Sequence, residues 1–176
     1  MADRTRQAGG VRRPGKAVAL FGVSGGVVLL DQASKNFIRV LLQPGDAQAV
    51  VEGVLRVTYL LNPGSAFGLA VGGANGPTLL SLAATLLLAL VFLFMPVELR
   101  FRLYAVALTF GGALGNLIDR LKDPPGVVDF IDLRLGSLSF PVFNLADVAV
   151  LFGTIALIVA IWWDERRLHE RQRRAS

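Results

Sequence analysis

The chain has 176 residues, of which 53% are hydrophobic and only 18% charged, and its mean hydropathy is +0.57. This is too apolar for an ordinary soluble domain, in which about a quarter of the residues are charged. The chain has no cysteine, and its one histidine, His169, lies in an arginine-rich tail. Disulfides, thiolate nucleophiles, histidine-based triads and multi-histidine metal sites are therefore excluded as serious candidates.

The net charge of +5 comes largely from the two ends of the chain. Five cations precede the first apolar run and five follow the last one, with no nucleic-acid-binding motif between them. Cations that flank apolar spans are typical of membrane proteins. We therefore expect the protein to contact membrane lipids and no nucleic acid. The expected organisation is a membrane domain at 17–163 with partly disordered basic tails at 1–16 and 164–176.

Four apolar segments predict four transmembrane helices, in an all-α membrane protein with a small extracytoplasmic β element. In chain order they are 17–30, 77–97, 103–118 and 141–163. About 20 helical residues cross a bilayer core, so the first and third segments need their polar ends to span it. The first segment also fits a cleaved signal peptide. No small-residue cleavage site follows it closely, which favours a retained membrane anchor.

An even number of spans places both basic tails on one side, which the positive-inside rule makes the cytoplasm. The short loop with Arg100 and Arg102 is expected there too. Trp162 and Trp163 suit either an interfacial belt at that face or ordinary packing of the span.

Two segments between the spans have strand character, and the topology places both on the outer side. Residues 49–60 are rich in β-branched side chains and partly alternate, and residues 132–140 predict a short hairpin around Gly136 and Ser137.

Polar groups at the outer ends of the predicted spans are the candidate functional residues, because ionisable groups at membrane depth are costly and usually mark a site. They form five clusters: Asp31 with Lys35; the segment 62–67; Asn116 with Asp119 and Arg120; the segment 127–130 with Asp129; and Asn144 with Asp147. The topology brings all five to one face.

Some of these clusters also have a purely structural interpretation. Asp31 and Lys35 are four residues apart on a helix and could form an ion pair without chemistry. For Asp119, a salt bridge with its neighbour Arg120 is slightly favoured. The small residues at 111–115 most often indicate close helix packing.

The remaining polar residues differ in how strongly they suggest chemistry. Asn116 and Asn144 more often satisfy backbone groups than bind a substrate. Asp147 could serve a helix N-cap, although its place inside an apolar run weakens that alternative. Asp129 has two apolar neighbours in the sequence, which makes it a candidate for a raised pKa.

Five short strings resemble, in order and at matching spacing, the sequence blocks of bacterial lipoprotein signal peptidase (signal peptidase II). They are DQASK (31–35), NPGSAF (62–67), GGALGNLIDR (111–120), VVDFID (127–132) and FNLAD (143–147). The resemblance covers roughly residues 17–163, and five ordered blocks are highly specific. Pro63 and the long arginine-bearing tails depart from the usual pattern.

The resemblance implies a four-span inner-membrane aspartyl endopeptidase that works without cofactor or metal. It would cleave diacylglyceryl-modified prolipoproteins just before the lipid-modified cysteine, near the periplasmic face, with both termini cytoplasmic. It assigns Asp129 and Asp147 as the catalytic pair. Groups that contact substrate or support the site would be Asp31, Lys35, Asn62, Gly64, Asn116, Asp119, Arg120 and Asn144. We further expect the enzyme to act as a monomer.

The chemistry of a carboxylate pair agrees with this resemblance. Peptide hydrolysis without a metal, thiol or histidine needs a base for water and an acid for the carbonyl oxygen and leaving amine. Two carboxylates that share one proton supply both, and the sequence does not indicate which of them is protonated.

Three other functions remain as alternatives. Asp119, Asp123, Asp129 and Asp132 could hold magnesium for lipid phosphotransfer, although they surround a proline-rich loop rather than one helix face. A Ser-Lys protease is poorer, because Ser34 and Lys35 are adjacent and point to different faces. A channel or transporter lacks a polar path, since the segment 77–97 carries no charge.

Overall fold

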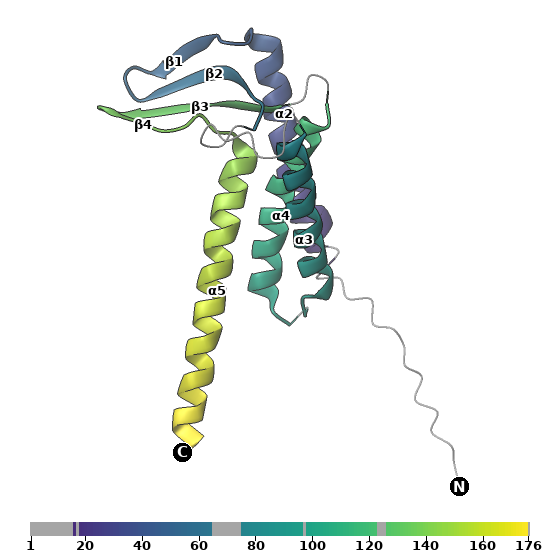
Figure 1. The fold of residues 1–176 in the computed structure, drawn as a ribbon. Coiled ribbons are helices and arrows are strands. Elements are labelled where there is room, and N and C mark those ends of the chain that lie inside the picture. The colour runs from purple at the N-terminus through teal and green to yellow at the C-terminus, as the bar shows by residue number, and fades with distance from the viewer. Residues whose placement is uncertain (1–15, 17, 65–74, 97, 123–125, 176) are drawn as a thin grey trace.

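The computed structural model describes residue 16 and residues 18–64, 75–96, 98–122 and 126–175. Its helices are the π-helical segment η1 (Val18–Ser24), α2 (Gly25–Leu41), α3 (Gly76–Phe94), α4 (Arg100–Arg120) and α5 (Leu145–Ala175). Its strands are β1 (Ala47–Val51), β2 (Leu55–Asn62), β3 (Val127–Leu135) and β4 (Leu138–Ser139). The sheet lies across one end of the helices, and α5 extends farthest from it (Figure 1).

Among the described residues, three helices are long and apolar enough to cross a membrane: Gly76–Phe94, Arg100–Arg120 and the Leu145–Arg167 part of α5. The fold is thus that of a membrane protein with a small antiparallel sheet, and three of the predicted spans are confirmed on length and composition. The first predicted span is helical through η1 and α2 but is not among the three. This part of the chain is divided into the 7-residue η1 and the 17-residue α2, so neither helix alone has the length of the other three.

The ends of the last helix differ from the prediction. The segment 141–144 is not helical, because Phe143 forms a bridge with Ile131 of β3, and α5 begins at Leu145. At the other end α5 continues to Ala175, so the prediction of a partly disordered tail from residue 164 is wrong for the described residues. The tail contains five arginines and two glutamates, which are good helix formers. The N-terminal tail at 1–15 lies outside the described residues.

The sheet has four antiparallel strands in the order β1-β2-β3-β4. The predicted hairpin around Gly136 is confirmed as the β3–β4 turn, where Gly136 has φ +61°. The segment 49–60 forms two strands instead of one run, with Gly53 (φ +73°) in the turn between them. Only glycine takes such positive φ values readily.

Helix α4 lies at the centre and contacts η1, α2, α3 and α5. The small residues at 111–115 permit this closeness, as predicted: a Cβ added at Gly115 would lie 2.6 Å from Asp31 Oδ2. Beneath the sheet, Val128 and Phe130 of β3 pack with Ile38 and Leu42 at the end of α2. This apolar contact fixes β3 against the helix ends.

Candidate active site

Asp129 lies on β3 with its side chain almost fully buried at 3% exposure. Successive strand residues point to opposite faces of the sheet. The Asp129 side chain therefore lies on the face opposite to that of its neighbours Val128 and Phe130. Its Oδ1 accepts a hydrogen bond from Asn144 Nδ2 (2.6 Å) and its Oδ2 one from Asn62 Nδ2 (2.9 Å). Both donors are amides, and the carboxyl group is held from two sides.

Asn62 ends β2 and lies diagonally across from Asp129, because Leu60 is the residue directly opposite. Its side chain is oriented by a local turn: the Gly64 N–H donates to Asn62 Oδ1 (2.9 Å). Gly64 has φ +92°, and a Cβ there would overlap Pro77. Residues 65–67 of the same block lie outside the described residues.

Asp147 stands in the first turn of α5 and forms a capping box with Asn144. The Asn144 N–H donates to Asp147 Oδ2 (3.1 Å), and the Asp147 N–H donates to Asn144 Oδ1 (3.0 Å). The N-cap residue is therefore Asn144, so the alternative of Asp147 as the N-cap is wrong, and Asp147 contributes the other half of the capping box. The capping box uses only Oδ2 of Asp147, since Asp147 Oδ1 accepts a hydrogen bond from Asn116 Nδ2 (2.8 Å). Asp147 is only half-buried, unlike Asp129.

Asn116 and Asn144 join the two carboxyl groups. Asn144 donates to Asp129 and caps the turn that carries Asp147, while Asn116 donates to Asp147. The two amides also touch each other, with Asn144 Nδ2 3.3 Å from Asn116 Oδ1. The alternative that these amides merely satisfy backbone groups is thus wrong for Asn116, whose side chain bonds only side chains in the described structure.

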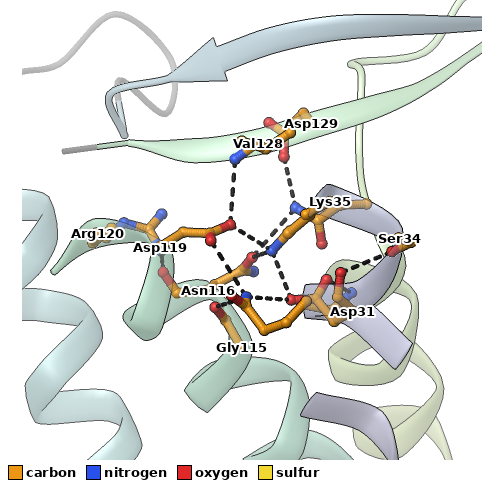
Figure 2. A network of polar contacts seen from close by, with 12 residues as sticks. Asp31, Ser34, Lys35, Gly115, Asn116, Asp119, Arg120, Val128 and Asp129 are labelled. Carbon is orange, nitrogen blue, oxygen red and sulfur yellow. Dashed lines mark hydrogen bonds and ion pairs between the residues drawn. The ribbon is translucent and has the colours of Figure 1, made fainter. Parts of the chain in front are cut away.

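Lys35 is the centre of a buried ionic cluster next to this pair (Figure 2). Its side chain is fully buried, and its ammonium lies 2.8 Å from Asp31 Oδ2, 2.9 Å from Asp119 Oδ2 and 3.0 Å from Asn116 Oδ1. The predicted ion pair of Asp31 with Lys35 is confirmed. Three acceptors satisfy all three ammonium protons.

The two acids of this cluster hold the backbones that carry the candidate pair. Asp31 Oδ1 accepts the Ala146 N–H (3.0 Å) in the first turn of α5, where a negative charge also favours the helix dipole. Asp119 Oδ2 accepts the Val128 N–H (3.4 Å), next to Asp129, as Figure 2 shows. Lys35 thus connects the two acids, Asp31 and Asp119, that hold the first turn of α5 and strand β3.

The favoured salt bridge between Asp119 and Arg120 is not what the structure shows. Asp119 pairs with Lys35, and on its other oxygen with Arg39 (3.1 Å) and Lys122 (3.2 Å). Consecutive residues on a helix point in different directions, which separates the two side chains. Arg120 instead donates to the Asn116 carbonyl (3.3 Å) and Ser81 Oγ (3.5 Å).

Three residues of this network were missed by sequence reasoning: Gln32, Arg39 and Lys122. Gln32 Nε2 lies within hydrogen-bond distance of Asp31, Asp119 and the Gly115 carbonyl, and its Oε1 accepts from Lys122. The spacing of residues 32, 35 and 39 along α2 places them on one helix face, and this was the available signal. For Lys122 the sequence contained none.

Burial raises the pKa of Asp129 to about 6, and the nearby charge of Asp147 acts in the same direction. The hydrogen bonds from Asn62 and Asn144 and the charge of Lys35 oppose this rise. The sequence-based expectation of a raised pKa agrees with this direction. An acid with such a value changes protonation close to neutral pH.

The acidic residues considered for magnesium have separate partners. Asp119 faces cations, Asp129 faces amides, and Asp132 pairs with Arg134 (3.0 Å) and Arg56 (3.9 Å). Asp123 lies outside the described residues. Within the described part of the chain, no three such side chains gather as a metal site.

Comparison with known proteins gives one consistent result. A family described as signal peptidase (SPase) II matches residues 23–163. The chain is 44% identical over 135 residues to a lipoprotein signal peptidase of Moorella thermoacetica, covering 74% of this chain and 84% of the relative. It is 34% identical over 149 residues to one of Staphylococcus aureus, covering 83% and 89%. A bacterial membrane enzyme solved at 2.3 Å by the in meso method superposes with TM-score 0.70 at 30% identity, covering 85% and 90%.

Proposed function

Because this chain belongs to the signal peptidase II family, we propose that Asp129 and Asp147 are the catalytic pair with which it acts. The chain is an aspartic peptidase of the membrane that removes signal peptides from prolipoproteins. The observation that carries the assignment of the pair is the joining of these two carboxyl groups by Asn116 and Asn144 at the sheet end of the helices.

The two aspartates have different environments, which suits different roles. Asp129 is the more buried and has the raised pKa, so it is the member that holds the shared proton. Asp147 is half-buried and accepts hydrogen bonds on both oxygens, an arrangement that suits a carboxylate base. Asp147 then takes a proton from the attacking water while Asp129 donates its proton to the scissile carbonyl oxygen. When the C–N bond breaks, Asp147 gives its proton to the leaving amine and Asp129 takes one back from a hydroxyl of the tetrahedral intermediate, which restores the starting protonation of the pair.

The other predicted residues support this reaction in two ways. Asn62, Gly64, Asn116 and Asn144 fix the two carboxyl groups, and Asp31, Lys35 and Asp119 fix the backbones beneath them. Arg120 has a buried Nε without a partner among the described residues and lies close enough for its charge to interact with both aspartates. We assign it to binding a carbonyl oxygen of the substrate, where a fixed cation stabilises developing negative charge.

The pKa of Asp129 predicts how cleavage depends on pH. As pH rises through about 6, Asp129 loses the proton that it must donate, so the rate should fall. The Asn62 hydrogen bond favours the ionised form, so Asn62→Leu should raise this pKa and move the fall to higher pH. The measurement is the pH profile of kcat/KM for both proteins. A profile that keeps its position, or moves to lower pH, in Asn62→Leu would contradict the role of Asp129 as the acid.

The proposed topology has four spans, with the helix formed by η1 and α2 as the first. Asp31 and Lys35 neutralise each other in its second half, which lowers the cost of burying them in a membrane. The peptidase domain is then 17–163 of the inner membrane, with the sheet and site near the periplasmic face and the segments 1–16 and 164–176 cytoplasmic.

Reporter fusions test this topology. A reporter before Lys16 or after Ser176 should be cytoplasmic, and one inserted at Gly53, in the turn between β1 and β2, should be periplasmic. Opposite sides for the two termini would exclude an even number of spans.

The proposed substrate form is a prolipoprotein whose cysteine carries diacylglycerol, cut just before that cysteine by a single copy of the enzyme. Lipid chains in the bilayer would hold the scissile bond at a fixed depth near the pair. The test is a gel-shift assay of purified enzyme on modified and unmodified precursor, each with and without chelator. We expect cleavage of the modified form at the same rate with chelator present. Equal cleavage of both precursors would remove the lipid requirement, and loss of cleavage with chelator would revive a metal mechanism.

A further inference from the structure

A second polar site lies at the opposite end of α4 and α5 from the aspartate pair. A cavity of about 590 Å³ is lined there by the start of α4, the residues before it, and the segment 156–167 of α5. Asp147 and Trp163 both lie on α5, separated by roughly 24 Å of helix at 1.5 Å per residue. The peptidase reaction therefore makes no use of this cavity.

The cavity combines cations with an apolar wall. Arg100, Arg102 and Arg167 line it together with two acids, Glu98 and Asp164, and Asp164 is already paired with Arg102 at 2.9 Å. The lining further along α5 toward the membrane interior consists of Ala156, Val159 and Ala160, which are small and apolar. Cations outnumber acids, so the polar end of the cavity suits an anion.

Two further observations concern the arginines themselves. Arg102 Nε is buried and has no hydrogen-bond partner within the described part of the chain. An unpaired buried N–H is costly. Arg167 lies over the ring of Trp163 at 5.5 Å, which holds its charge at the rim of the cavity.

We propose that this cavity binds an anionic phospholipid, with the phosphate at the arginines and one acyl chain along the wall of small residues. A phosphate diester offers acceptor oxygens to Arg102 Nε and a negative charge to Arg100 and Arg167. Basic pockets between membrane helices are a known mode of headgroup recognition, and the apolar wall distinguishes a lipid from free phosphate.

The experiment uses the full-length protein in nanodiscs that contain equal amounts of phosphatidylglycerol and phosphatidylcholine, with retained lipid counted by native mass spectrometry. Arg167→Gln should retain about fivefold less phosphatidylglycerol than wild type. The matched control is Arg166→Gln, because Arg166 lies over Trp162 at 3.9 Å and does not line the cavity. Arg100→Gln is a second variant that removes a lining cation without disturbing the Trp163 contact.

Three results would overturn the proposal. Equal retention of both lipids by wild type would show that the charge of the headgroup does not matter. An equal loss in Arg166→Gln would indicate general surface charge instead of a cavity. Displacement of phosphatidylglycerol by added inorganic phosphate would identify a free-anion site.

Discussion

Replacing either Asp129 or Asp147 by Asn is expected to lower the rate of prolipoprotein cleavage by at least about a hundredfold. Asn has nearly the size of Asp but cannot take up and release a proton, so each change removes one partner of the acid-base pair. Asp129→Asn should melt within a few degrees of the wild type at neutral pH. The buried Asp129 has a pKa raised from 3.8 to about 6, so its ionised form opposes folding above that pH, and Asn relieves this cost.

The matched control is Asp132→Asn, the same chemical change on the same strand. Asp132 is also buried, but it pairs with Arg134 and Arg56, away from the amides that join the pair. It should keep near wild-type cleavage. Wild-type activity in Asp129→Asn together with loss in a folded Asp119→Asn would move the role of the acid from Asp129 to Asp119.

The Lys35→Met protein is expected to unfold roughly 10 °C below the wild type, because it leaves two buried carboxylates without their shared cation. Asp31 and Asp119 are both 0% exposed and hold the N–H groups of Ala146 and Val128. Loosening these contacts displaces α5 and β3 together, so cleavage should fall even at temperatures where the protein stays folded. Thermal unfolding in detergent and cleavage at low temperature measure the two effects.

Lys122→Met provides the comparison for this variant. Its ammonium also lies 3.2 Å from Asp119, but the side chain is 40% exposed. Exposed ion pairs contribute little, so its melting temperature should stay close to that of the wild type. If Lys35→Met melts no lower than Lys122→Met, the buried cluster does not support the site.

The helices were largely predictable from hydropathy and the β3–β4 hairpin from its turn, whereas the pairing of β2 with β3 was not. Long apolar runs, the last of them interrupted by Asp147 alone, identified α3, α4 and α5, because membrane spans need that length and composition. The pairing of β2 with β3 joins residues about 70 positions apart in the sequence, and alternation within one strand carries no information about its partner. The high charge of residues 164–175 does not distinguish a disordered tail from a solvent-exposed helix, so the end of α5 at Ala175 could not be predicted.

For the site, the sequence predicted which polar groups meet and the ion pair of Asp31 with Lys35, but not the partners of Asp119. The ends of the predicted spans place Asp31, Asn116 and Asp147 at a similar depth in the membrane. This placement follows from the span boundaries and does not depend on side-chain conformation. The partner of Asp119 depends on helix rotation, which brings Lys35 of α2 to it and turns Arg120 away. The capping box of Asp147 with Asn144 depends on α5 starting at Leu145, which the apolar run from residue 141 did not indicate.

The central claim is that Asp129 and Asp147 act as one unit, and the cleavage rate of the Asp129→Asn/Asp147→Asn double variant tests it most directly. Groups that share one proton lose their function together when either is changed, so the double variant should cleave within about threefold of the slower single variant. If the loss in the double variant instead equals the product of the two single losses, the two aspartates act independently and do not form a catalytic pair.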